Sequence, residues 1–153
     1  MACADGDCER INNQDASDNV SALTQLADSM YAKGVVTSEY RDALLKREES
    51  FPTGLMTQTI GVAIPHTDPD KVIEPQIGFM SLKHPVTFHQ MGDNAEIQVK
   101  LIFMLALKKS DDQLSMLQRL MALFQNQEAM DALQKIDQKN DFLDLMKKNE
   151  IIE

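Results

Sequence analysis

The chain has 153 residues, a length typical of a single domain. Hydrophobic residues make up 43% of it and charged residues 25%, so the composition predicts a packed core and excludes a disordered acidic tail. With 15 basic and 24 acidic residues the net charge is −9, which argues against nucleic acid or an anionic membrane as the main partner, because both reward a basic surface.

Residues 1–17 are polar and rich in Asp, Asn and Gly, and we expect a flexible leader there, followed by one domain over residues 18–153. The leader does not resemble a secretory signal, and no apolar run approaches the roughly 18 residues of a membrane helix. Cys3 and Cys8 match no strong zinc spacing, so we expect exposed, reduced thiols, with an adventitious or redox site as the alternative. These features favour a cytoplasmic location.

Two helices that pack as a hairpin are predicted in the first third of the chain. Apolar residues recur at helical spacing over residues 20–30, with Ser17 or Asp18 as the N-cap and Gly34 where a C-terminal cap belongs. The second helix is expected over residues 37–47, opened by its threonine.

The pattern changes to that of strands after the turn-like FPTG sequence. The apolar run over residues 97–107 has the length and β-branched start of a central strand, although its pattern also fits a buried helix. Shorter strands are expected at residues 60–64, 76–82 and 86–88.

The last third is helical in pattern. The sequence Ser110–Gln113 has the S-x-x-Q form of a capping box and stands directly before an apolar stripe. Two further helices are expected, over residues 127–136 and from about residue 140 to the lysine pair at 147–148. The order of elements predicts an α/β domain in which helices cover a sheet.

Three histidines could carry chemistry, and their spacing fits no standard metal signature. We expect His84, in a turn before a proline, and His89, at the end of a short strand, to be surface or turn residues. His66 differs, because it follows a buried strand that Pro65 should end, which places the imidazole at the edge of the sheet. A neutral imidazole there can act as a nucleophile, and a histidine that only caps a turn is the alternative.

Three other residues are candidates for holding an anion near His66. Thr67 can donate a hydrogen bond, and Arg47 can hold a phosphoryl group with its guanidinium, although it can equally be a solvated helix residue. Gln113 would lie at a helix N-terminus, where anions collect, but in a capping box it would bond back to the backbone. No P-loop, G-x-S-x-G or G-x-G-x-x-G motif is present.

The segments KREESFPTG, IGVAIPHTD and SDDQLSMLQRLMALF, in this order over about residues 20–148, resemble the IIA component of the sugar phosphotransferase system (PTS), mannitol/fructose class. The resemblance implies a mixed β-sheet flanked by helices on both faces, and no metal or organic cofactor. It also implies that His66 accepts a phosphoryl group from the phosphocarrier protein HPr and passes it to a cysteine of the IIB component. IIB in turn serves the membrane component IIC.

Two departures refine the resemblance. The link LMTQTIGV is longer than in mannitol and fructose members and lacks their glycine pair, and Gln113 stands where they carry a second histidine. Both features resemble the galactitol-specific branch, which implies a sugar alcohol as the transported substrate. An amide can donate a hydrogen bond but cannot change charge with pH. A regulatory IIA-like protein, whose phosphorylation at His66 controls partner binding, is the alternative function.

Overall fold

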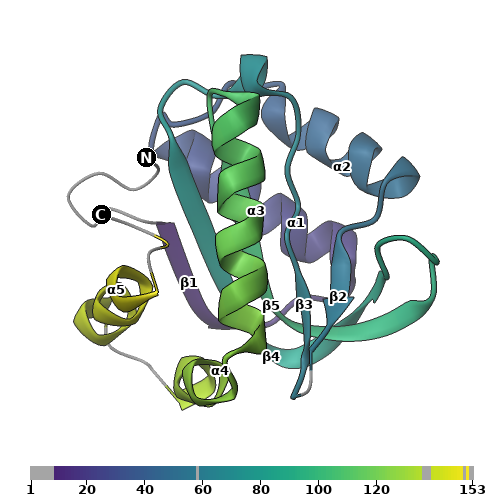
Figure 1. The fold of residues 1–153 in the computed structure, drawn as a ribbon. Helices are drawn as coiled ribbons and strands as arrows, with labels where there is room; N and C mark the ends of the chain where they lie inside the picture. Colours follow the sequence, from purple (N-terminus) through teal and green to yellow (C-terminus); the bar gives the residue numbers. More distant parts are fainter. Residues whose placement is uncertain (1–8, 58, 136–138, 150, 152–153) are drawn as a thin grey trace.

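The structure, a computed structural model, describes residues 9–57, 59–135, 139–149 and 151. Its centre is a five-stranded sheet with the order β1-β4-β5-β3-β2 (Figure 1). The strands are β1 (Glu9–Gln14), β2 (Gly54–Met56), β3 (Gly61–Ala63), β4 (Gln76–His89) and β5 (Glu96–Ala106). The pairs β1–β4 and β3–β5 are parallel, and β4–β5 and β2–β3 are antiparallel, so the predicted mixed sheet is confirmed.

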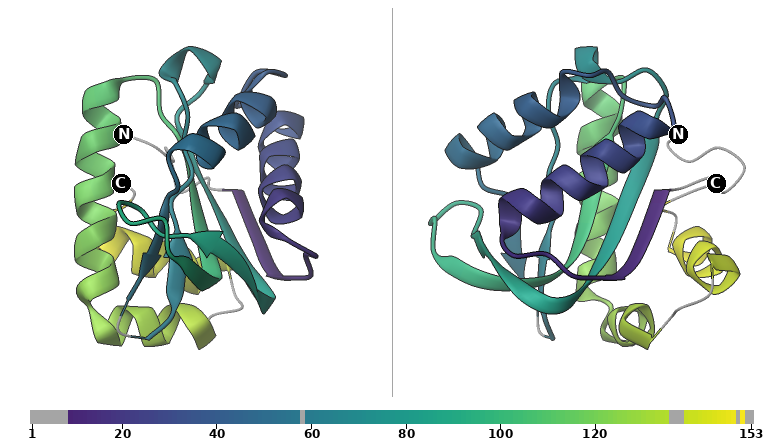
Figure 2. Two further views of the ribbon diagram at one scale, coloured as in Figure 1. Left: turned by 90° about the vertical axis from the view of Figure 1, so that its right-hand side faces the viewer. Right: turned by 180° about the vertical axis from the view of Figure 1, so that it is seen from behind.

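Helices cover both faces of the sheet, as predicted (Figure 2). They are α1 (Asn19–Ala32), α2 (Tyr40–Ser50), α3 (Ser110–Gln125), α4 (Gln127–Lys135) and α5 (Lys139–Lys148), with a short 3-10 helix at Pro69–Lys71. Helices α1 and α2 lie on one face, and α3, α4 and α5 lie on the other. The layering is therefore helix, sheet, helix.

Each face has its own hydrophobic core, and β5 contributes to both. Successive side chains of a strand point to opposite faces. Phe103 and Leu105 accordingly pack under α3 with Leu120, whereas Ile102 and Met104 pack on the side of α1 and α2. The alternation fixes the register of β5, because a shift by one residue would exchange the two sets of side chains.

Helix α1 begins and ends where the sequence predicts. Asp18 is the N-cap, and its carboxylate accepts a hydrogen bond of 2.7 Å from the Ser21 amide. Gly34 follows the helix with a φ of +76°, a left-handed conformation that glycine adopts without a steric penalty. Val20, which was expected on the apolar stripe, is 52% exposed.

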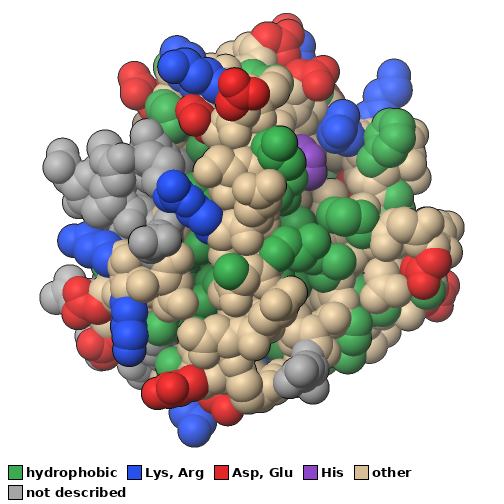
Figure 3. Space-filling view, in the orientation of Figure 1, with side chains coloured by type: hydrophobic (Ala, Val, Ile, Leu, Met, Phe, Trp, Pro, Cys, Tyr) green, Lys and Arg blue, Asp and Glu red, His purple; other side chains and the backbone are tan. Residues whose placement is uncertain are grey.

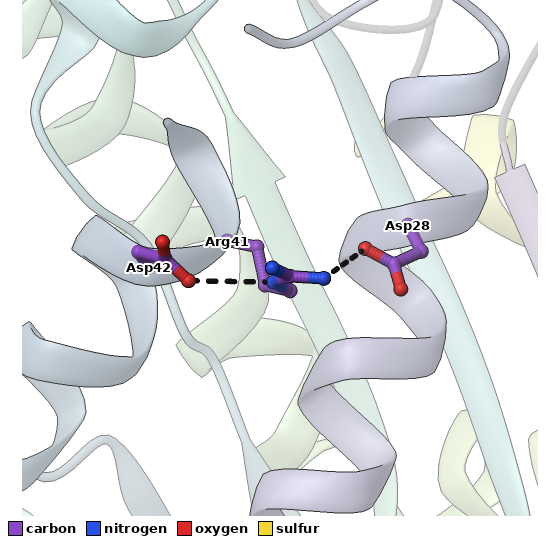
Figure 4. Close-up of polar contacts among 3 residues, drawn as sticks. All are labelled: Asp28, Arg41 and Asp42. Carbon is purple, nitrogen blue, oxygen red and sulfur yellow. Dashed lines mark hydrogen bonds and ion pairs between the residues drawn. The ribbon is translucent and has the colours of Figure 1, made fainter. Parts of the chain in front are cut away.

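Helix α2 begins three residues later than predicted. The Thr37 amide donates to the Lys71 carbonyl at 2.9 Å, and the neighbouring Val36 pairs with Val72 as an antiparallel bridge. This backbone is therefore extended, and the helix can begin only at Tyr40. Helix packing is assisted by Arg41, whose Nη1 lies 3.3 Å from a carboxylate oxygen of Asp28 on α1 (Figure 4).

The expected flexible leader over residues 1–17 was wrong for residues 9–14, which form β1 and pair in parallel with β4. The unpaired edge of β4 offers hydrogen-bonding groups to any extended segment, and the polar sequence ERINNQ carries no alternating pattern that would indicate a strand. Cys3 and Cys8 lie outside the described residues. The single domain expected over residues 18–153 stays a prediction.

The turn predicted around His84 was also wrong. Residues 76–82 and 86–88 belong to one long strand, β4, whose register against β5 shifts between Ser81 and Val86. Pro85 lies within this irregularity, where its missing N–H does not interrupt the ladder. His84 is exposed, as expected, and His89 is the last residue of the strand. None of the helices among the described residues combines the length and apolar character needed to cross a bilayer.

Candidate functional site

His66 lies just beyond the end of β3, beside the central strand. The chain continues along β5 after β3 ends, because the Leu105 amide donates to the Pro65 carbonyl at 3.0 Å and His66 forms a parallel bridge with Leu105. On the other side, the Ile64 amide donates to the Thr53 carbonyl at 3.2 Å. The backbone that carries the imidazole is thus held by both neighbouring segments, as the pattern IGVAIPH predicts for a strand end.

The hydrogen bonding of the imidazole assigns its tautomer. His66 Nδ1 lies 2.9 Å from the Ile64 carbonyl oxygen. A carbonyl can only accept, so Nδ1 carries the hydrogen and, in the neutral ring, the lone pair is on Nε2. The ring is half-buried, and its free nitrogen is the one available to an incoming electrophile.

The surroundings lower the pKa of His66 below its usual value near 6.5. Burial is the larger cause, because it disfavours the charged ring, and the positive charge of Arg47 acts in the same direction. The hydrogen bond to the Ile64 carbonyl opposes both. The net effect keeps the imidazole neutral, and therefore nucleophilic, at neutral pH.

Arg47 is half-buried in the last turn of α2, and its guanidinium carbon lies 5.2 Å from the centre of the Phe51 ring. Its Nε is buried and has no hydrogen-bond partner among the described residues. An unpaired buried donor is costly, and an anion bound beside it would remove that cost. The position of this donor near His66 therefore favours an anionic ligand.

Gln113 is not part of a capping box, which corrects the prediction. The N-cap of α3 is Lys109 and makes no side-chain capping bond, so Ser110 is already helical. The Gln113 side-chain amide instead donates to the Thr67 carbonyl at 3.0 Å. A contact across 46 residues has replaced the local one, and it brings the amide beside the residue that follows His66.

Thr67 is buried, with 5% of its surface exposed. Its carbonyl is occupied by Gln113, so the two residues form one unit next to His66. The four candidates from the sequence thus lie in one region: Arg47 is on α2, Gln113 is on α3, and His66 and Thr67 follow the end of β3.

Glu48 is a site residue that the sequence reading missed. The residue is 8% exposed, and its carboxylate accepts hydrogen bonds from the backbone amide and the hydroxyl of Thr53. The signal for its burial is present in the sequence, because Tyr40, Leu44 and Glu48 repeat every four residues and so share one face of α2. The position of Glu48 in line with two buried residues of α2 indicates that its carboxylate is buried too.

Exposed hydrophobic side chains lie along α3 and around β2. Figure 3 shows a band of them in front of the sheet, with a histidine at its upper end. Phe51, Met56 and Leu114 are 62%, 57% and 59% exposed. A hollow of about 200 Å³ between β2 and α3 is lined by Leu55, Met56, Thr57, Met121, Phe124 and Gln125.

Among the residues that the structure describes, no group of three or more His, Cys, Asp or Glu side chains is arranged to hold a metal ion. The histidines do not converge either: His66 lies at the end of β3, whereas His89 ends β4.

The mixed sheet with helices on both faces defines an α/β protein, and a half-buried imidazole whose Nε2 is free of its Nδ1 hydrogen bond lies beyond the end of one inner strand. The family model of the phosphoenolpyruvate-dependent sugar phosphotransferase system, EIIA 2, matches residues 7–149, so the chain belongs to this family and is a PTS IIA component, a phosphocarrier. The resemblance stated from the sequence is confirmed.

Relatives and solved structures agree with this assignment. The galactitol-specific EIIA component of Escherichia coli K12 is 31% identical over 116 residues, which is 76% of this chain and 77% of the relative. The IIA mannitol protein of Escherichia coli superposes with a TM-score of 0.73 at 18% identity, covering 90% of this chain and 95% of the other. IIA mannitol in its complex with phosphorylated IIB mannitol superposes with a TM-score of 0.74 at 19% identity, covering 92% and 94%. At these identities the two structures show the fold alone.

Proposed function

We propose that His66 is the phosphoacceptor of this IIA component. It would take a phosphoryl group from phospho-HPr and pass it to a cysteine of a cognate IIB. The observation that carries this role is the 2.9 Å contact of Nδ1 with the Ile64 carbonyl, which leaves Nε2 with its lone pair. The transfer forms a bond between Nε2 and phosphorus while the nitrogen–phosphorus bond of the donor histidine breaks, and the donor nitrogen keeps the electron pair. Nδ1 retains its proton.

Arg47 and Gln113 are proposed to hold the phosphoryl oxygens, because phosphoryl transfer depends mainly on positioning and charge stabilisation. The Arg47 Nε is a donor without a partner among the described residues. Gln113 uses one N–H for Thr67 and has a second, since a side-chain amide carries two. Thr67 supports the arrangement through its carbonyl. We propose it as the residue that orients Gln113.

The exposed apolar side chains around the site are proposed as the docking surface for HPr and IIB. This surface consists of Phe51, Leu55 and Met56, and Leu114 and Met121 of α3 extend it. Apolar surface at the centre of a patch is typical of protein interfaces. That the superposed mannitol IIA was solved with phosphorylated IIB supports a IIB protein as one partner.

Galactitol is the proposed sugar alcohol, and a cytoplasmic relay between HPr, IIB and the membrane component IIC is the proposed setting. The proposal for the sugar rests on the galactitol-specific relative at 31% identity and on the glutamine at position 113. Selectivity for the sugar belongs mainly to the membrane component, so it is tested with IIB and IIC rather than with this chain alone.

A reconstituted relay tests the phosphoacceptor. The protein is mixed with phosphoenolpyruvate, enzyme I and HPr, and its intact mass is read beside that of His66→Ala. We expect one acid-labile phosphoryl group on the wild type and none on the variant, because only His66 presents a free ring nitrogen in the site.

His84→Ala is the matched control, since His84 is exposed on β4 and away from the site. It should be phosphorylated like the wild type. An unphosphorylated wild-type protein in the presence of phospho-HPr would overturn the proposal, as would a phosphorylated His66→Ala. Phosphorylation without onward transfer to any IIB would instead support the regulatory alternative.

A further inference from the structure

Glu48 is a buried carboxylate whose two oxygens are both used by one residue. One oxygen accepts from the Thr53 amide at 2.9 Å and the other from the Thr53 hydroxyl at 2.7 Å. Hydrogen bonds to an ionised acceptor are stronger than those between neutral groups, and a buried carboxylate needs such donors. The contact therefore holds both the backbone amide and the side chain of Thr53, which lies in the turn between α2 and β2.

Thr53 in turn holds the segment that carries His66. Its carbonyl accepts from the Ile64 amide at 3.2 Å, and the Ile64 carbonyl accepts from His66 Nδ1 at 2.9 Å. A sequence of hydrogen bonds thus runs from Glu48 through Thr53 and Ile64 to the imidazole.

The same carboxylate is next to Arg47 in α2. The Phe51 amide donates to the Arg47 carbonyl at 2.7 Å, which closes the last turn of the helix before the chain enters FPTG. Because Glu48 ties this last turn to Thr53, it fixes the placement of the Arg47 backbone relative to the strand end that carries His66. The position of the Arg47 guanidinium relative to the His66 imidazole thus depends on Glu48.

We infer that Glu48 is a positioning residue: through Thr53 and Ile64 it holds the His66 imidazole in the Nδ1–H tautomer, with Nε2 facing the incoming phosphoryl group beside Arg47. The consequence for transfer rests on the proposed function of His66, whereas the consequence for the tautomer does not. A free imidazole in water prefers the Nε2–H form, so release of Nδ1 would place the hydrogen on the reacting nitrogen.

Three variants of the full chain separate positioning from stability. Glu48→Gln replaces one of the two acceptors with a donor, and Thr53→Val removes one of the two bonds while retaining the backbone amide. Thr57→Val is the matched control: Thr57 follows β2 directly, and its hydroxyl donates to the Ile60 carbonyl at 2.7 Å rather than to Glu48. The milder Thr53→Val keeps the test available if Glu48→Gln does not fold.

The readout is the tautomer of His66, from the ring nitrogen chemical shifts in two-bond nitrogen–proton NMR spectra above pH 7. We expect a single Nδ1–H form in the wild type and in Thr57→Val, and an Nε2–H population raised at least several-fold in Glu48→Gln and Thr53→Val. Folded variants of Glu48 and Thr53 with the wild-type tautomer would overturn the inference, and so would an equal change in Thr57→Val.

Phosphoryl transfer from phospho-HPr is measured on the same samples. If Glu48 acts by positioning, the maximal rate should fall about tenfold or more in Glu48→Gln, while the half-saturating concentration of phospho-HPr stays within twofold, because the docking surface is unchanged. A wild-type protein that accepts no phosphoryl group would overturn the proposed function, and the tautomer measurement would still decide the role of Glu48.

Discussion

The His66 imidazole has two properties that a free histidine lacks. Its hydrogen is fixed on Nδ1, and its pKa is lowered, so that Nε2 stays unprotonated at neutral pH. The Ile64 carbonyl supplies the first, and burial supplies most of the second. A phosphoacceptor needs both, because a protonated Nε2 has no lone pair to donate. The local sequence IGVAIPH carries the arrangement, since β3 ends at Ala63 and the next residues continue along β5 to the imidazole.

The pKa of His66 should therefore be below 6.5 in an NMR titration of the ring protons. Arg47→Gln should raise it, because the charge of Arg47 is one of the two causes of the lowering, but not to 6.5, because burial is the larger cause. A pKa unchanged by Arg47→Gln would contradict the proximity of the two side chains. Arg41→Gln, on the outer side of the same helix, is the control and should have no effect.

The same shift has a consequence for stability. Because the folded-state pKa of His66 is lowered, the unfolded chain binds the proton more tightly, and stability falls as the pH drops from about 6.5 through the folded pKa. In urea unfolding at a series of pH values, His66→Gln should lose less stability over this window than the wild type. A steeper loss in the variant would show that the sign of the shift is wrong.

At the scale of the element, helix α2 carries adjacent residues with different roles. Tyr40 is fully buried, and its hydroxyl donates to the Leu105 carbonyl at 2.7 Å, which ties the helix to the strand beside His66. Burial raises the pKa of this hydroxyl, so it remains a donor throughout the physiological range. Arg41, one residue on, forms only exposed ion pairs.

Tyr40→Phe should destabilise the protein by about 1–3 kcal/mol, because it leaves the buried Leu105 carbonyl without its donor. Arg41→Ala should cost less than about 1 kcal/mol, because exposed ion pairs contribute little. Urea unfolding of both variants checks the order. A larger loss for Arg41→Ala than for Tyr40→Phe would contradict it.

The sequence predicts best the elements whose signals, apolar spacing and helix caps, lie within the element itself. The strand over residues 97–107 and the helix after Asp18 are confirmed because their apolar spacing and caps are local features. The helix start at Thr37 was wrong because the preceding Val36 pairs with the distant Val72 as a β-bridge. The capping box at Ser110 was wrong because the distant Thr67 carbonyl accepts the hydrogen bond of the Gln113 side chain. β1 had no local signal at all.

For the site, the residues could be named from the sequence but their contacts could not. The sequence pointed to His66, Arg47, Thr67 and Gln113, and the fold brings all four to one region. The acceptor of Nδ1 is a main-chain carbonyl, Ile64, and no side-chain pattern reports which carbonyl an imidazole will reach. Glu48 was overlooked because a charged residue in a helix is usually solvated, and only its tertiary partner Thr53 makes burial favourable.

At the scale of the whole molecule, two cores share one sheet, and the core under α3 depends on aromatic packing. The Phe103 ring lies 5.1 Å from that of Phe79 and 5.6 Å from that of Phe124, centre to centre. Interiors are closely packed, so a cavity there is not refilled by small movements. This core also supports Leu105, the strand residue that pairs with His66.

Phe103→Ala should lower the free energy of unfolding by about 3–5 kcal/mol, as expected for truncation of a fully buried aromatic residue. Val20→Ala is the control, because Val20 is 52% exposed despite its place in the apolar periodicity of α1, and it should change the free energy by no more than about 0.5 kcal/mol. Equal losses in chemical denaturation would mean that Val20 is buried in solution.

β5 is the middle strand of the sheet and the last of the five in the chain. Until residues 96–106 have been made, β1 and β4 can form one pair and β2 and β3 another, without the two ladders through which β5 joins β4 to β3. Because synthesis proceeds from the N-terminus, the β1–β4 pair and the β2–β3 pair both have unpaired strand edges until β5 is made. A nascent chain that stops before residue 96 already contains His66, Arg47 and Thr67, yet it lacks Leu105, against which the strand end is aligned.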